Sequence, residues 1–470
     1  MREFLGNVGV SCPASARVPG VPVERNKEAS VSQQAGRSVG LWGAIAIGVG
    51  GMVGGGIFAV LGEAVSIAHG ATPLAFLAGG LLAWLTALAY AHLSVAFPSR
   101  GGTVVFIDQA FGNNLLSGSV NLMLWLSYLV TIALYATAFA SYAETFFASP
   151  RAPWLHHVLI TAAIALPMLI NIANAGLVSR SETAIVGLKV ALIALVIVAS
   201  APYVKLGPMT ATPPSAWGAA IPAGLIIFVA YEGFELIANS AEDITAPSRT
   251  LPRAFMACVL FVVALYVLIA VITVGTVPEA QLLKAKDYVL AVAAEPALGH
   301  AGFIIVALAA LLATFSAINA TIYGTARLGY VLAKDGQLPQ RFARQRASTP
   351  VTGVIATALI AMVLANLIDL TDIAIIGSAS FLLVFALVGA SAWRLRARIG
   401  GPSWVYALGA LSCAGALVVL LIHTWRGNAF GVVVFAAFAL ISLLFEWLYG
   451  RYVRGHFLGR AYVGSDDAAA

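Results

Sequence analysis

The sequence predicts an all-α polytopic membrane protein with about twelve transmembrane helices, two of which are interrupted within the bilayer. Three observations support this fold class. Of the 470 residues, 60% are apolar and only 10% are charged, whereas soluble proteins carry about a quarter charged residues. Apolar stretches near the roughly 20 residues that a helix needs to cross a bilayer recur along the chain. Finally, six of the nine residues from Gly48 to Gly56 are glycine, inside the first of these stretches.

The apolar stretches divide the chain into a core and flanking segments. We expect residues 1–38 to form a disordered cytoplasmic tail, residues 39–400 a core of ten helices, residues 401–450 two further helices, and residues 451–470 a second cytoplasmic tail. The predicted spans lie at about 40–68, 72–98, 113–147, 155–175, 181–203, 217–241, 251–277, 300–333, 350–368, 373–393, 402–424 and 429–449.

Lysine and arginine are distributed unevenly between the two sides of the predicted membrane. The side opposite the N-terminus has only Arg151, Lys205, Lys284, Lys286 and Arg426. Because loops rich in Lys and Arg stay in the cytoplasm, we expect both termini to be cytoplasmic and the protein to lie in the plasma (inner) membrane. We find no basic cluster with interleaved aromatic residues, so the net charge of +6 does not indicate a nucleic-acid partner.

The glycine run Gly48–Gly56 predicts that the first transmembrane helix is broken. Each glycine costs roughly 1 kcal/mol in a helix interior relative to alanine, so a continuous helix through six of them is unfavourable. A break within the bilayer is tolerated only where the freed N–H and C=O groups face protein, water or a bound solute. The run therefore predicts a solute site at membrane depth. The alternative is that the glycines only allow close helix packing.

The segment Phe228–Glu235 predicts a second break. Its sequence, Phe-Val-Ala-Tyr-Glu-Gly-Phe-Glu, places a glycine and two carboxylates in the centre of the span 217–241, where an ionised acid costs at least a few kcal/mol. We expect the break near Tyr231–Phe234. The interrupted helices would then be the first and the sixth, at equivalent places in two inverted repeats at about 39–203 and 217–398. Proteins built this way hold a solute where the half-helix ends meet.

Four local motifs occur in order along the chain. They are Gly54-Gly55-Gly56-Ile57-Phe58 in the first helix, Gly187-Leu-Lys189-Val190 in the fifth, Phe228 to Arg253 in and after the sixth, and Ser316 to Gly336 in the eighth. Over about residues 38–400 the sequence thereby resembles the amino acid–polyamine–organocation superfamily, in particular its proton-coupled amino acid permeases. The resemblance implies a five-plus-five inverted repeat with discontinuous helices 1 and 6 and two extra helices.

The two breaks and the resemblance together suggest how a zwitterion would bind. The N–H groups freed at Gly54–Gly56 lie at a half-helix N-terminus, whose partial positive charge suits a carboxylate. The freed carbonyls of Val229, Ala230 and Glu232 would accept hydrogen bonds from an ammonium group. Of the three aromatic residues Phe228, Tyr231 and Phe234, we expect only Phe234 to close over the solute as a lid, and the alternative for each of them is packing between helices.

Lys189 is the residue that we expect to couple transport to protons. It lies inside an apolar helix, where a lysine costs about 2.5–3.5 kcal/mol. Burial disfavours the charged form of a lysine, so Lys189 could load and release a proton in each cycle. The resemblance implies that its ammonium occupies the place of sodium in sodium-coupled relatives, with Ser316 as the hydroxyl partner and Thr314 as the second choice. The competing interpretation is a fixed internal tether that never titrates.

Glu232 departs from the family, which usually has an apolar residue at this place, whereas Glu235 matches a common acid that we interpret as structural. A carboxylate of Glu232 facing the solute would attract a cationic molecule, such as a polyamine or a basic amino acid, or could itself carry a proton. A carboxylate turned into a hydrogen-bond network would leave the solute class unchanged. The sequence leaves these alternatives open.

We therefore expect a secondary active transporter of amino acids, working by proton-coupled symport and alternating access, with the proton as coupling ion and no cofactor or metal. Its partners would be the small-molecule solute, an amino acid or related amine, and the lipid bilayer; the oligomeric state is not indicated. The alternatives are a polyamine or cation importer, an amino-acid exchanger, and a membrane-embedded sensor. An enzyme would need a nucleophile–base pair or metal cluster at membrane depth, and we find neither in the sequence.

Overall fold

The computed structural model describes residues 38–148, 152–212, 214–345, 349–427, 429–454 and 458–460. Most of the predicted tails at 1–38 and 451–470 therefore lie outside the described residues. Across the described residues the chain is almost entirely helical, and ten helices are long and apolar enough to cross a bilayer. This confirms the predicted all-α membrane class. Two shorter apolar helices, Leu41–Met52 and Val351–Leu367, accompany them, so the total of about twelve spans and the inverted repeat stay predictions.

The helices follow the predicted spans in order. They are α3 (Leu41–Met52), α4 (Gly56–Ala68), α5 (Thr72–Ala96), α6 (Thr103–Phe111), α7 (Leu115–Glu144), α8 (Trp154–Ser200), α9 (Gly207–Thr210), α10 (Pro214–Ile226), α11 (Leu236–Asn239), α12 (Pro247–Thr276), α13 (Glu279–Lys284), α14 (Val289–Lys334), α15 (Val351–Leu367), α16 (Leu370–Arg394), α17 (Arg396–Ile399), α18 (Ser403–Gly427) and α19 (Ala429–Tyr449). The short strands β1 (Asn113–Asn114) and β2 (Leu458–Arg460) pair in antiparallel orientation. Two candidate spans that we predict as separate helices, Trp154–Ala173 and Ile185–Tyr203, are joined in the structure by α8, and the second continues into the 3-10 helix η2 (Ala201–Tyr203).

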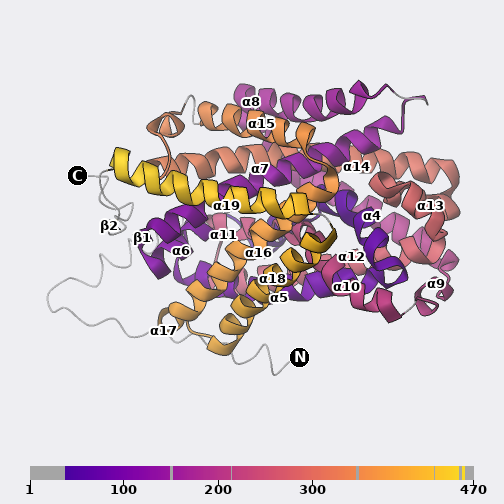
Figure 1. Cartoon of the computed structure of the whole chain (residues 1–470), viewed down its shortest axis with the longest axis horizontal. Coiled ribbons are helices and arrows are strands. Elements are labelled where there is room, and N and C mark those ends of the chain that lie inside the picture. Colours follow the sequence, from indigo (N-terminus) through magenta and orange to yellow (C-terminus); the bar gives the residue numbers. More distant parts are fainter. Residues whose placement is uncertain are drawn as a thin grey trace.

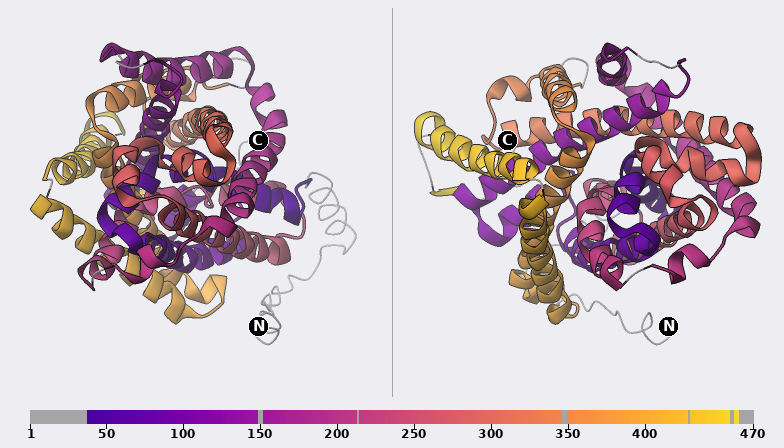
Figure 2. Two further views of the ribbon diagram at one scale, coloured as in Figure 1. Left: turned by 90° about the vertical axis from the view of Figure 1, so that its right-hand side faces the viewer. Right: turned by 45° about the vertical axis from the view of Figure 1, so that its right-hand side comes forward.

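Helix α7 lies in the core of the bundle. In the most apolar stretch of α7, 89% of the residues are buried, whereas the corresponding values are 33% in α18 and 22% in α19. Figure 1 shows α8 and α15 along one edge of the bundle, with α7 and α14 beside them and α5 and α10 toward the opposite edge. α18 and α19 lie at the periphery in both views of Figure 2. Side chains of α7 are therefore placed to contact groups at the centre of the protein.

Both predicted breaks are present. In the first, α3 ends at Met52, and α4 begins at Gly56. In the second, α10 continues into the 3-10 helix η3 (Ile227–Tyr231), a turn follows at residues 232–235, and α11 then begins at Leu236. Each break thus separates two helical segments at the place where the sequence departs from the composition of an ordinary membrane helix.

Glycine allows the two broken segments to touch along their backbones. A Cβ placed on Gly51 would lie 2.6 Å from the carbonyl oxygen of Gly233, and one on Gly56 would lie 2.9 Å from the Cα of Ala230. Residue numbers rise along the first segment as they fall along the second, so the segments run antiparallel. Gly233 also has a φ of +116°, a conformation that L-residues with a side chain rarely adopt.

The chain before α3 is fastened to the turn after α11. The carbonyl oxygen of Asp243 accepts hydrogen bonds from the amides of Ser38 and Val39, at 3.1 and 3.0 Å, and the amide of Thr245 donates to Val39 at 2.9 Å. Arg100 lies 3.6 Å from the carboxylate of Asp243. These contacts join the start of the first broken segment to the end of the second, on the side that we predict to be cytoplasmic.

Gly51→Ala tests the backbone contact between the breaks. The added methyl group would overlap the carbonyl of Gly233, and because overpacking costs roughly 1–3 kcal/mol, we expect the variant to melt at a lower temperature in detergent. Gly415→Ala is the matched control, since a Cβ there meets nothing within 4 Å, and it should match or exceed the wild type in stability. Equal melting temperatures for both variants would contradict the contact.

Candidate functional site

The first break leaves the amides at the start of α4 without helical partners. The first four N–H groups of a helix have no acceptor within the helix, and they carry a partial positive charge. Gly55 is the N-cap residue of α4 and has no side chain with which to accept hydrogen bonds from them. Gly56, Ile57 and Phe58 are buried, so this group of donors lies in the protein interior.

Side chains from α12 and α16 contact backbone groups that the breaks free. The hydroxyl of Tyr266 on α12 lies 2.6 Å from the carbonyl oxygen of Met52 and 3.3 Å from that of Ala230. Ser378 on α16 accepts a hydrogen bond from the amide of Val229 at 2.9 Å. A buried polar group without a partner costs about 1–3 kcal/mol. Tyr266 and Ser378 therefore reduce the cost of both interruptions.

Three polar residues of α7 meet the carboxylates of the second break. Tyr128 donates to Glu235 at 3.1 Å, and Thr131 and Tyr135 donate to the same oxygen of Glu232, at 3.3 and 3.4 Å. Both glutamates are buried, with exposed fractions of 4% for Glu232 and 0% for Glu235. These α7 residues are not among the site residues that we predict from the sequence. Their spacing of three and four positions, which puts them on one helical face, was the signal that could have found them.

The structure brings the predicted binding residues of the two breaks together. A Cβ on Gly55 would overlap the ring of Tyr135, and the hydroxyl of that tyrosine reaches Glu232. The carbonyl of Val229 accepts a hydrogen bond from the amide of Glu232 at 3.2 Å. Two of the carbonyls predicted to bind an ammonium, those of Val229 and Ala230, thus have protein partners here.

Phe234 lies in an aromatic cluster. Its ring is fully buried, with ring centroids 5.4 Å from Tyr90, 6.4 Å from Phe255 and 5.3 Å from Phe385. These are the distances of packed aromatic side chains. The contacts of Phe234 are therefore those of a core residue, and its role as a lid over the solute stays a prediction.

Lys189 and Ser316 come from two helices that pack against the first broken segment. Lys189 lies on α8 with 3% of its surface exposed, one turn after Val186, whose side chain contacts Gly50. Ser316 is half-buried on α14, and the residue after it, Ala317, packs against Gly54. Helices α8 and α14 thus both pack against the first broken segment, and the roles of Lys189 and Ser316 stay predictions.

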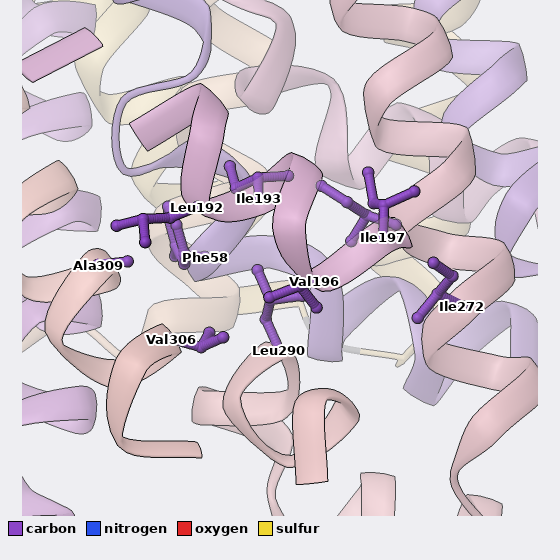
Figure 3. A pocket seen from close by; sticks show the side chains of 10 residues that line it. Phe58, Leu192, Ile193, Val196, Ile197, Ile272, Leu290, Val306 and Ala309 are labelled. Carbon is purple, nitrogen blue, oxygen red and sulfur yellow. The ribbon is translucent and has the colours of Figure 1, made fainter. Parts of the chain in front are cut away.

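A separate cavity lies between α4, α8, α12 and α14 (Figure 3). Its lining consists of Phe58, Leu192, Ile193, Val196, Ile197, Ile269, Ile272, Leu290, Val306 and Ala309. All ten side chains are apolar, so a charged solute would lose its hydration there without gaining hydrogen bonds. This cavity does not have the chemistry of a site for a zwitterion.

A polar network holds α4 beyond the first break. Lys286, in the 3-10 helix η5 (Lys286–Tyr288), forms an ion pair with Glu63 of α4. The ammonium group of Lys286 also donates to the hydroxyl of Thr371 on α16 at 3.1 Å, and that hydroxyl lies 2.9 Å from the carboxylate of Glu63. Because the side chain of Glu63 is only 9% exposed, this pair is partly shielded from water. It links α4 to the chain segments around it.

Asp108 on α6 lies in a second polar cluster. The side-chain amide of Asn121 donates to Asp108 at 3.1 Å and to the side-chain oxygen of Gln337 at 3.2 Å. The pKa of Asp108 is raised from 3.8 to about 7, mainly by burial; the nearby acids Asp335 and Glu446 act in the same direction, and the hydrogen bond from Asn121 opposes the shift. Asp108 therefore changes its charge near neutral pH.

Two interrupted membrane helices packed side by side, with free first-turn amides and buried carboxylates at the interruptions, are the architecture of a membrane transport protein. In the part of the chain that the structure describes, no three His, Cys, Asp or Glu side chains are grouped to hold a metal ion. The chain belongs to the amino acid permease family, which it matches over residues 39–446. This confirms the resemblance to permeases of the amino acid–polyamine–organocation superfamily.

Relatives of the chain extend over nearly its whole length. It is 33% identical to an uncharacterized protein of Methanocaldococcus jannaschii over 432 residues, which cover 91% of this chain and 99% of the relative. It is 32% identical over 410 residues to the inner membrane transport protein YbaT of Escherichia coli, covering 87% and 95% of the two chains. The methylthioribose transporter of Bacillus subtilis is 24% identical over 400 residues, covering 80% and 84%.

The raised pKa of Asp108 predicts a pH-dependent stability. A carboxyl whose folded-state pKa lies above its unfolded value stabilises the protein below the unfolded value, and this contribution is lost as the pH rises through the folded value of about 7. Between pH 5 and pH 8 the wild type should therefore lose stability relative to Asp108→Asn, by about 1.4 kcal/mol per pH unit at most. Thermal unfolding of both proteins in detergent across this range measures the difference. A constant difference would contradict the shift.

Proposed function

We propose that the protein is a secondary active transporter that carries amino acids together with protons across the plasma membrane by alternating access. The observation that carries this proposal is the pairing of the two breaks. The amides at the start of α4 suit a carboxylate, and the carbonyls of Val229, Ala230 and Glu232, which would accept hydrogen bonds from an ammonium group, lie in the segment packed against them. Membership of the amino acid permease family supports transport, and the description of that family favours amino acids as solutes.

Lys189 is the proposed proton carrier, with Ser316 as its partner. A lysine that charges inside a protein loses hydration, so its protonation follows the access of water and the presence of hydrogen-bond acceptors around it. Lys189 is buried on a helix that contacts the first break. A change in the access of that break would therefore change the protonation of Lys189 as well. This linkage would couple the movement of a proton to the movement of the solute.

The proposed orientation follows from the charge of the loops. The side with more Lys and Arg is placed in the cytoplasm, which puts both termini there in the plasma (inner) membrane, and the proton is the only coupling ion in this proposal. An amino-acid exchanger would perform the same binding chemistry without net proton flux. A polyamine or cation importer would need no carboxylate on its solute. A sensor would bind solute and move none.

Purified protein in liposomes with an imposed pH gradient separates these functions. Radiolabelled alanine and other amino acids are offered outside, with the lumen more alkaline than the medium. We expect accumulation that collapses when a protonophore is added, reaching about tenfold per pH unit if one proton accompanies each solute. Uptake only against preloaded internal amino acid would indicate exchange, and binding without uptake would indicate a sensor.

Lys189→Ala tests the coupling role. We expect this variant to lose accumulation driven by the pH gradient, down to a ratio of about one, because it cannot release a proton from the helix next to the first break. Lys205→Ala is the matched control, since Lys205 is exposed, and it should accumulate solute as the wild type does. Accumulation by Lys189→Ala at the wild-type ratio would show that the coupling proton moves on another group.

A further inference from the structure

Glu232 is a buried acid that has no ionic partner among the residues that the structure describes. It lies within the second break with 4% of its surface exposed, and it takes part in none of the ion pairs found among the described residues. The same holds for Glu235, three residues later. Removing a carboxylate from water is costly unless a cation and hydrogen bonds replace its hydration. The position of Glu232 therefore favours a positively charged group nearby.

The two glutamates of the break are held differently. Glu235 accepts hydrogen bonds from the amide of Gly233 at 2.8 Å and from Tyr128 at 3.1 Å, one on each oxygen. One oxygen of Glu232 accepts hydrogen bonds from two hydroxyl groups, at 3.3 and 3.4 Å. These distances are longer than the 2.7–2.8 Å that is usual for a hydroxyl donor. Glu235 is thus part of the turn itself, whereas Glu232 is bound loosely by residues from another helix.

Tyr135 connects Glu232 to the first break. Its ring lies on Gly55, at the start of α4, while its hydroxyl reaches Glu232. A solute whose carboxylate binds the amides of Gly54–Gly56 must take space that Tyr135 now fills. Displacing this tyrosine removes one of the two donors of Glu232, and a donor carried by the solute would replace it. A cationic donor would also neutralise the carboxylate.

We propose that Glu232, together with Thr131, forms a subsite for a cationic group on the side chain of the solute, so that the preferred substrates are amino acids with a basic side chain. This proposal rests on the proposed function, because the carboxylate of the solute stays on the amides of α4. A polyamine has no such carboxylate, so it would bind the Glu232 subsite and leave the amides of α4 without a ligand. The phenol of Tyr135 occupies the subsite when no solute is bound.

Lysine and norleucine test the subsite, since norleucine is lysine without its terminal amine. Initial uptake rates of each, radiolabelled and at equal concentration, are measured in proteoliposomes, with alanine as a probe of amino-acid transport in general. We expect the wild type to take up lysine at least about tenfold faster than norleucine, a difference of about 1.4 kcal/mol. In Glu232→Gln, which keeps the shape of the side chain, the preference should fall to about one.

Two further variants keep the test specific. Glu446→Gln makes the same change at another buried acid, on α19, and should preserve the preference for lysine. Tyr135→Phe keeps the ring and removes the hydroxyl that holds Tyr135 on Glu232, so the KM should fall for lysine and norleucine alike, while the preference for lysine stays. This second result does not depend on the folding of Glu232→Gln.

The possible failures are distinguishable. If norleucine or alanine enters as fast as lysine in the wild type, the cationic subsite is wrong and amino-acid transport stands. If Glu232→Gln keeps the full preference for lysine, another group binds the side chain and this proposal is wrong. If alanine, norleucine and lysine all fail to enter under every gradient, the proposed function fails as well.

Discussion

The protein depends on one constraint: a backbone polar group freed inside a membrane must find a partner within the protein. Two interruptions far from each other would leave two sets of such groups. Here Gly51 and Gly233 pack against each other, and the hydroxyl of Tyr266 lies within hydrogen-bond distance of carbonyls from both segments. The two interruptions therefore share a hydrogen-bond partner, and packing them together lowers the free-energy cost of each.

The same contact concentrates charge at the centre of the bundle. The first break contributes the positive end of α4, and the second contributes the buried acids Glu232 and Glu235, which the polar face of α7 holds. Farther along α4, Glu63 forms an ion pair with Lys286, while the carbonyl of Asp243 accepts hydrogen bonds from the chain before α3. These contacts hold the two ends of the first broken helix.

Both breaks could be predicted from the sequence because they violate general rules for a membrane helix. Six glycines weaken the helix at Gly48–Gly56, and two carboxylates near Gly233 are too costly for a lipid-facing turn. The partners that stabilise the breaks could not be predicted in this way. Tyr266 lies 214 residues from Met52, and no local pattern relates them. The ring contacts of Phe234 could not be predicted either, because Tyr90, Phe255 and Phe385 lie on three other helices.

Amide hydrogen exchange of residues 53–58 tests the central claim most directly, because these residues connect the two halves of the first broken helix and begin α4. The protein is measured in lipid nanodiscs with and without a saturating amino acid that it transports, with α18 as the internal reference. A solute bound to these amides should slow their exchange and leave α18 unchanged. Exchange of residues 53–58 that is identical with and without the transported solute would contradict the claim that the freed backbone holds it.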